Sequence, residues 1–141
     1  FEEIILDQIN LIPGKKVVVL GKPGDEQSYD SVENTEIYNH VKRQKQNELL
    51  NRAKFIVCRS GYTTIMELIA LKKPALMIPT PGQTEQEYLA CHYQATGIFH
   101  IARQDGLDLS AELNNIQNSA GPCMDHIPVN DTKAIRRLLS K

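Results

Sequence analysis

The sequence predicts an α/β fold in which helices flank a parallel β-sheet. Short apolar runs with β-branched residues, such as 17–20 and 55–58, are typical of buried parallel strands. Stretches with apolar residues at helical spacing alternate with these runs, as in a parallel sheet with helices on both faces. Ligands of such sheets bind beyond the carboxyl ends of the strands, so we expect the functional residues in the polar turns there. These turns are residues 21–24, 59–63 and 79–84.

Length and composition favour one domain, over residues 1–141, with a core of its own. The formal net charge of −1 lacks the basic excess of a nucleic-acid-binding protein. No apolar run approaches the ~20 residues that a membrane span needs, and the first residues do not resemble a signal peptide. Because the sequence starts without Met and directly in a helical pattern, we expect a fragment of a larger protein.

Cysteine and histidine usage predicts neither a disulfide framework nor a metal site. Cys58, Cys91 and Cys123 are scattered and odd in number, which fits a reducing compartment and a cytoplasmic location. The histidines and cysteines show no metal-ligand spacing. Cys58 is the last residue of a predicted buried strand and has no neighbouring base, so we expect it to be buried and unreactive.

The first half of the chain is expected to hold two helices and one buried strand. The apolar residues of 2–12 recur on one side of a helix, which Pro13-Gly14 ends. Residues 21–36 are predicted as a polar loop, because their glycines match neither the dinucleotide nor the P-loop spacing. The remaining predicted elements are the strand 17–20, a short extended piece within 35–41, and a helix over 44–53 with Leu49, Leu50 and Ala53 facing inward.

The second half repeats the alternation of strands and helices. The predicted strands are 55–58, 75–78 and an edge strand over 98–101, and the predicted helices start at 63, 84, 109 and 131. Thr84, with Glu87 as its capping-box partner, is the expected cap of the second of these helices, and Gly97 is expected to end it. The helices 109–118 and 131–139 are predicted from their amphipathic patterns.

The stretch from Val57 to Glu67 combines a strand end, a glycine turn and the start of a helix. Gly61 allows a sharp turn and a close approach of a ligand to the backbone, and Thr63 or Thr64 is an expected helix cap. The free N–H groups and the dipole at such a helix start favour an anion. Glu67 either complements the dipole or accepts hydrogen bonds from the two hydroxyls of a ribose.

These residues resemble the C-terminal domain of the family 28 glycosyltransferases, which have the GT-B fold with Rossmann-like domains. The family includes the N-acetylglucosaminyltransferase that forms lipid II and relatives of the UDP-glucuronosyltransferase type. The resemblance is specific from about residue 42 to residue 100. It is carried by Cys58-Arg59-Ser60-Gly61, Thr64, Glu67, the run from Leu71 to Pro79, and Gln86.

The resemblance implies that this domain binds the UDP-sugar donor of a hexosyltransferase, with no other cofactor. Glu67 matches the glutamate that binds the ribose hydroxyls, and Gln86 matches a glutamine that contacts the donor sugar. Ser60, Gly61 and Thr64 match the turn and helix start that hold the diphosphate, and the backbone near Arg43 is expected to read the uracil edge. The catalytic base of the family lies in the N-terminal acceptor domain, so we expect this chain alone to bind the donor without turnover.

The chain departs from the family at several positions. Glu87 stands where relatives often carry a second glutamine, and Ala90 stands where they carry an asparagine, so the donor sugar is open. No stretch of this sequence matches the Gly-rich loop of the family, and we expect the first helix of this chain to be the one that follows that loop. Arg59 is expected to anchor its loop by pairing with a carboxylate, with phosphate binding as the alternative.

Three other functions are compatible with the sequence. One is a UDP-sugar hydrolase or epimerase on the same fold. Another is a non-catalytic subunit that binds the donor or recruits a partner or a membrane, and here the last helix carries Arg136, Arg137 and Lys141. The third is an α/β domain with no ligand. The family resemblance itself implies a cytoplasmic protein with a peripheral association with the membrane.

Overall fold

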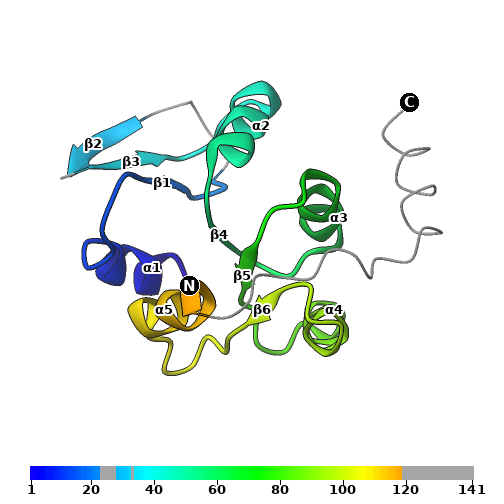
Figure 1. The fold of residues 1–141 in the computed structure, drawn as a ribbon. Helices are drawn as coiled ribbons and strands as arrows, with labels where there is room; N and C mark the ends of the chain where they lie inside the picture. The colour runs from blue at the N-terminus through cyan, green and yellow to red at the C-terminus, as the bar shows by residue number, and fades with distance from the viewer. Residues whose placement is uncertain (23–27, 33, 119–141) are drawn as a thin grey trace. The chain divides into compact units, whose positions relative to one another are not determined.

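The computed structural model describes residues 1–22, 28–32 and 34–118 (Figure 1). They form five helices and six strands in two compact units. Of the described residues, Phe1–Ala53 and Asp108–Ala111 form the first unit, and Lys54–Leu107 and residues 112–118 form the second. The predicted loop 119–122 and helix 131–139, with Arg136, Arg137 and Lys141, lie outside the described residues.

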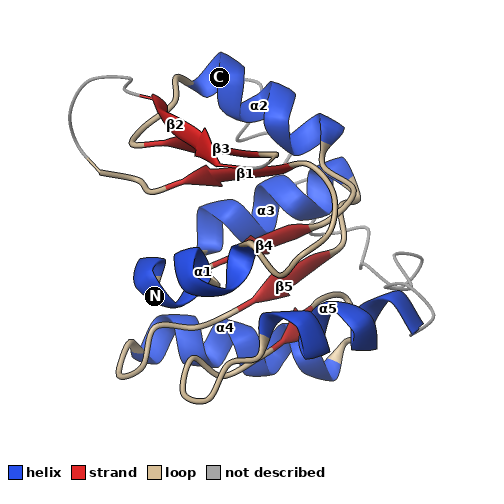
Figure 2. Cartoon of the chain, turned by 90° about the vertical axis from the view of Figure 1, so that its left-hand side faces the viewer, coloured by secondary structure: helices blue, strands red, loops and turns tan. Residues whose placement is uncertain are grey.

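The α/β class with parallel strands and flanking helices is confirmed (Figure 2). The described strands form two sheets of three strands each, where the sequence predicted one all-parallel sheet. The sheet of the first unit is mixed, and that of the second unit is entirely parallel.

The first unit contains a mixed sheet of order β1-β3-β2. Its strands are β1 (Lys16–Val19), β2 (Ser28–Val32) and β3 (Thr35–Tyr38), and its complete helices are α1 (Glu2–Ile9) and α2 (Arg43–Arg52). β3 pairs in parallel with β1 and antiparallel with β2. The prediction of a loop over 21–36 is therefore wrong at β2. Asn34, with a φ of 65°, provides the left-handed residue that starts the return into β3.

Several predictions for the first unit need correction. The helix predicted over 2–12 ends at Ile9. The strand predicted as buried alternates instead, because Val17 and Val19 on one side of β1 are 36% and 43% exposed. No residue of α2 is buried, so Leu49 and Leu50 are only partly covered. Within the described residues β1 pairs with one neighbour, which makes it an edge strand.

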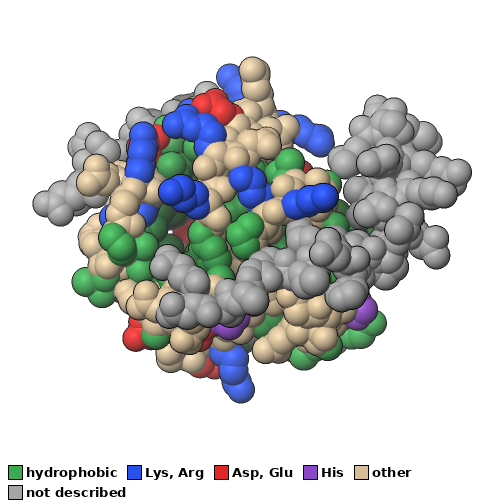
Figure 3. Space-filling view, viewed as in Figure 1, with side chains coloured by type: hydrophobic (Ala, Val, Ile, Leu, Met, Phe, Trp, Pro, Cys, Tyr) green, Lys and Arg blue, Asp and Glu red, His purple; other side chains and the backbone are tan. Residues whose placement is uncertain are grey.

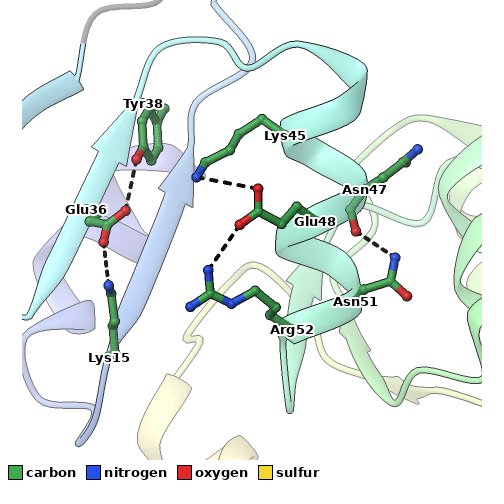
Figure 4. Close-up of polar contacts among 8 residues, drawn as sticks. All are labelled: Lys15, Glu36, Tyr38, Lys45, Asn47, Glu48, Asn51 and Arg52. Carbon is green, nitrogen blue, oxygen red and sulfur yellow. Dashed lines mark hydrogen bonds and ion pairs between the residues drawn. The ribbon is translucent and has the colours of Figure 1, made fainter.

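Charged and polar side chains of the first unit pair locally (Figure 4). The carboxylate of Glu36 accepts hydrogen bonds from Lys15 at 2.7 Å and from the hydroxyl of Tyr38 at 2.9 Å. The bond from Lys15, followed by that from Tyr38, lowers the pKa of Glu36. On α2, Glu48 pairs with Arg52 at 3.1 Å and with Lys45 at 3.9 Å. These are exposed ion pairs, which contribute little to stability.

The second unit contains the parallel sheet β4-β5-β6. Its elements are β4 (Ile56–Cys58), α3 (Tyr62–Leu71), β5 (Ala75–Met77), α4 (Thr84–Ala95) and β6 (His100–Ile101), and α5 (Leu109–Asn118) begins in the first unit and continues into the second. The core lies at the central strand and the inner side of α3, because Leu76, Met77, Ile65 and Leu68 have no exposed surface. The parallel order brings the carboxyl ends of all three strands to one edge.

The predicted elements of this unit are largely correct. The helix over 109–118 is confirmed as α5, and Gly97, with a φ of 69°, follows the end of α4 as expected. β6 is an edge strand within the described residues, as predicted, although it is shorter than the predicted run. β4 is half-buried rather than buried, because it pairs only with β5 in the described sheet.

Candidate functional site

The N-terminus of α3 presents backbone donors at the carboxyl end of β4. The first backbone hydrogen bond there runs from the amide of Ile65 to the carbonyl of Gly61 at 3.0 Å, which leaves the amides of residues 62–64 without intrahelical acceptors. Gly61 is the N-cap, and no side chain caps this helix. The expectation that Thr63 or Thr64 is the cap is therefore wrong, because both lie inside the helix.

Gly61 has open space on the side where a side chain would stand. Its backbone is extended, with a φ of −78°, a conformation that any residue adopts. The turn into α3 therefore does not require a glycine at this position, contrary to expectation. A Cβ at this position would meet no atom of another residue within 4 Å. The space over Gly61 thus allows a ligand to approach the open amides of α3 closely.

Ser60 links the turn after β4 to the first turn of α4. It has no exposed surface, and its hydroxyl donates a hydrogen bond to the carbonyl of Gln86 at 2.9 Å. A buried hydroxyl needs such a partner, so this bond holds the two segments together. The predicted contact between Ser60 and a diphosphate stays a prediction, with the hydroxyl proton already committed to the protein.

Gln86 organises the turn between β5 and α4. Its side-chain oxygen accepts from the amide of Thr80 at 2.9 Å, and its side-chain nitrogen donates to Gln83 at 2.6 Å. The N-cap of α4 is Gln83, so the expectation of a capping box begun by Thr84 is wrong. Glu87 does reach back, and it accepts from the amide of Gly82 at 2.9 Å. The side chain of Gln86 is therefore fixed beside the turn where a sugar contact was predicted.

Glu67 is the acidic residue of α3. It lies three residues after Thr64, a spacing that makes the two side chains neighbours on the helix surface. The first turn of α3 contains no acidic residue, so Glu67 lies beyond the turn where the dipole acts strongly. Half-buried, it makes no hydrogen bond or ion pair with any described residue, which leaves its carboxylate available as an acceptor.

Arg59 anchors its loop by hydrogen bonds to carbonyl and amide oxygens, and its predicted pairing with a carboxylate stays a prediction. It donates to the carbonyls of Ile78 and Pro79 at 3.1 and 3.0 Å and to the side chain of Gln104 at 2.6 Å. Partial burial lowers the pKa of the Arg59 guanidinium. The partner Gln104 escaped the sequence analysis, because it lies 45 residues along the chain and no local pattern marks it.

Arg43 belongs to the first unit, whereas the other five predicted site residues belong to the second. It is the first residue of α2, its side chain is exposed, and neither Lys42 nor another side chain caps the helix. Its surroundings in the sequence are basic, and Lys and Arg side chains are prominent on the face shown in Figure 3. The predicted reading of uracil by this backbone stays a prediction.

The described residues contain neither a metal-binding cluster nor a membrane-spanning helix. No group of three or more His, Cys, Asp or Glu side chains in that part of the chain is placed to hold a metal ion. No described helix combines the length and the apolar character needed to cross a bilayer. Burial raises the pKa of the Cys58 thiol to about 12, so this thiol beside the candidate site is protonated and is no nucleophile at neutral pH.

Comparison with known proteins places these features in a family. The profile of the glycosyltransferase family 28 C-terminal domain matches residues 3–121. Three similar proteins, from Histophilus somni, Elusimicrobium minutum and Clostridium novyi, each bear the name UDP-N-acetylglucosamine--N-acetylmuramyl-(pentapeptide) pyrophosphoryl-undecaprenol N-acetylglucosamine transferase. No solved structure matches the chain at the level at which these proteins do.

The similarity to these relatives is partial. The Histophilus protein is 39% identical over 40% of this chain and 16% of its own length, and the Elusimicrobium protein is 58% identical over 23% and 9%. The Clostridium protein is 27% identical over 76% of this chain and 31% of its own length. The chain thus spans less than a third of the length of each. Because the family profile covers most of the sequence, the chain belongs to glycosyltransferase family 28, whose C-terminal domain it contains.

Proposed function

We propose that this chain binds the nucleotide of a UDP-sugar donor and serves as the donor half of a hexosyltransferase. The observation that carries the proposal is the start of α3. Its first amides are open, Gly61 leaves space above them, and the carboxylate of Glu67 has no partner among the described residues. Membership of the glycosyltransferase family and the names of the relatives support this function over a hydrolase, an epimerase or a non-catalytic subunit.

The parts of the donor are assigned to the residues by their chemistry. The diphosphate accepts hydrogen bonds from the amides at the start of α3, near Ser60, Gly61 and Thr64. The two ribose hydroxyls donate to the carboxylate of Glu67, whose two oxygens can accept both hydrogen bonds. Gln86 contacts the sugar, and the backbone at Arg43 reads the uracil.

The first turn of α3 also favours departure of the UDP leaving group. Negative charge grows on the diphosphate as the bond to the sugar breaks, and the amides of a helix start already point at that charge. Fixed dipoles of this kind need no reorganisation during the reaction. We propose that they supply the stabilisation of the leaving group without a metal ion.

The acceptor half and the location of the protein are part of the same proposal. We propose that the base that activates the acceptor hydroxyl lies in an N-terminal acceptor domain, in the same protein or a partner chain, so the present residues bind the donor without turnover. The relatives are named for an undecaprenol-linked acceptor, which is a lipid. A cytoplasmic enzyme in peripheral contact with the membrane would reach both substrates, and UDP-N-acetylglucosamine is the first donor to test.

Calorimetric titration of the natural full-length protein with UDP, ADP and UDP-N-acetylglucosamine tests the proposal. We expect UDP to bind more tightly than ADP, because a backbone that reads uracil rejects a purine, and the UDP-sugar to compete with UDP for one site. Equal affinity for UDP and ADP would contradict a uridine site. Binding of neither nucleotide would contradict the donor-binding function itself.

A further inference from the structure

Arg59 spans the carboxyl edge of the parallel sheet of the second unit. It follows β4 directly, and its guanidinium reaches the carbonyls of Ile78 and Pro79 just after β5. Its other terminal nitrogen reaches the side chain of Gln104, in the loop after β6, at 2.6 Å. One side chain thus connects the three segments that follow the three strands of this sheet.

The geometry of these contacts suits arginine alone among the cations. A guanidinium is planar and carries donors on both terminal nitrogens, so it can bind two carbonyls on one side and an amide oxygen on the other. Lysine carries its donors on a single atom and cannot span these acceptors.

The neighbouring residue extends the same arrangement. Ser60 donates from its buried hydroxyl to the carbonyl of Gln86, at the start of α4. Gln86 in turn holds the amide of Thr80, which directly follows Pro79. The contacts of Arg59 and Ser60 therefore fix both ends of the turn between β5 and α4 against the turn that leads into α3.

We propose that Arg59 is a positioning residue for donor binding, holding the start of α3 and the turn before α4 in register, and that it is not a ligand of the diphosphate. This inference rests on the proposed donor-binding function. It assigns a role to Gln104 as well, since that side chain holds one end of the guanidinium without being near the start of α3 in sequence.

The test compares UDP binding by the full-length protein and by three variants, Arg59→Lys, Gln104→Ala and the double variant. Arg59→Lys keeps the charge but loses the planar guanidinium with its two terminal nitrogens, so we expect UDP affinity to fall roughly tenfold or more. Gln104→Ala removes one acceptor, and we expect a fall of about threefold. Because both changes break the same connection, the double variant should bind about as weakly as Arg59→Lys alone.

Arg103→Ala is the matched control, because it removes an exposed cation next to Gln104 and should leave UDP affinity unchanged. Thermal melts of every variant establish that binding is measured on folded protein, and a role in stability alone would lower the melting temperature without changing the affinity. That result would overturn the inference.

Two further outcomes would also overturn it. If Arg59→Lys retained UDP affinity, the positive charge would matter and the planar guanidinium would not, as expected of a residue that binds the diphosphate directly. Wild-type affinity in Gln104→Ala would show that the connection to the third segment has no part in binding. Failure of the wild-type protein to bind UDP is a different result, which contradicts the donor-binding function before any variant is compared and removes this inference with it.

Discussion

Glu67 is the side chain whose chemistry depends most directly on the proposed nucleotide. Its carboxylate has no hydrogen-bond partner among the described residues, so the hydroxyls of a bound ribose could donate to it. We predict that Glu67→Ala lowers the affinity for UDP by roughly tenfold or more, because hydrogen bonds to a charged group are worth about 1.5–3 kcal/mol. Calorimetric titration of the variant measures this loss.

The control for Glu67 is Glu85→Ala, which removes an exposed acid from the first turn of α4. This change alters the net charge equally and should leave UDP affinity unchanged. A further comparison uses 2′-deoxy-UDP, which lacks one of the two ribose hydroxyls. The loss of affinity caused by Glu67→Ala should be smaller for 2′-deoxy-UDP than for UDP. Equal losses in the Glu67 and Glu85 variants would point to an effect of overall charge and contradict ribose binding by Glu67.

The thiol of Cys58 gives the stability a specific dependence on pH. Burial raises its pKa in the folded protein from 9.0 to about 12. Between these values the folded thiol keeps its proton while the unfolded thiol loses it, so the free energy of unfolding falls as pH rises through this window. We predict that Cys58→Ala removes this component of the decline. Denaturant melts of wild type and variant between pH 8 and about pH 11 measure it.

Cys91→Ala is the matched control, because it removes a thiol that is exposed rather than one in the parallel sheet. Its stability should follow the wild-type dependence on pH. Identical slopes for wild type and Cys58→Ala would contradict the raised pKa.

The sequence predicted the side chains that belong to local patterns, but not the contacts that form only in the folded chain. The candidate set at the start of α3 was found because a strand, a glycine and a helix are local patterns. The partners of Arg59 were not, since Gln104 comes close only once the parallel sheet has formed. The buried bond from Ser60 to Gln86 joins residues 26 apart and depends on tertiary structure in the same way.

At the scale of elements, Gly61 and Gly82 are both glycines at helix starts, and the structure separates their roles. A Cβ would find open space at both positions, but Gly61 has an ordinary φ whereas Gly82 has a φ of +80°. We predict that Gly61→Ala leaves the protein folded but weakens UDP binding, because the new methyl group occupies the ligand's approach. Gly82→Ala should instead cost about 1 kcal/mol or more of stability, because alanine is strained at positive φ.

Thermal melts together with UDP titrations of the two variants check this pair of predictions. Gly61→Ala should weaken UDP binding and leave the melting temperature nearly unchanged. Gly82→Ala should lower the melting temperature and leave UDP affinity nearly unchanged. Wild-type affinity in Gly61→Ala would mean that no ligand approaches the start of α3 closely.

The elements that the sequence predicted well are those with strong, continuous patterns. The strand β5 is apolar and fully buried, and α5 is amphipathic over the residues predicted. β2 was missed because its strand lies within a polar, acidic stretch and is made by pairing with β3. The caps of α3 and α4 were misplaced by one or more residues, because a threonine near a helix start resembles a cap whether or not its oxygen meets an amide.

At the scale of the whole molecule, burial differs between the two sheets. Every residue of β5 is buried, whereas β1 exposes Val17 and Val19. Amides open with a free energy that rises with the burial around them, so we predict slower hydrogen exchange in β5 than in β1. Exchange followed by mass spectrometry or NMR under native conditions measures both strands in one sample. Faster exchange in β5 would contradict this assignment of the core.

The measurement that tests the central claim most directly is an experimental structure of the full-length protein with UDP bound. We predict that both ribose hydroxyls lie within about 2.6–3.2 Å of the Glu67 carboxylate. The diphosphate oxygens should accept hydrogen bonds from the first amides of α3, beside Gly61, with Arg59 still bound to Gln104. UDP bound elsewhere, or at this place with its ribose away from Glu67, would contradict the account.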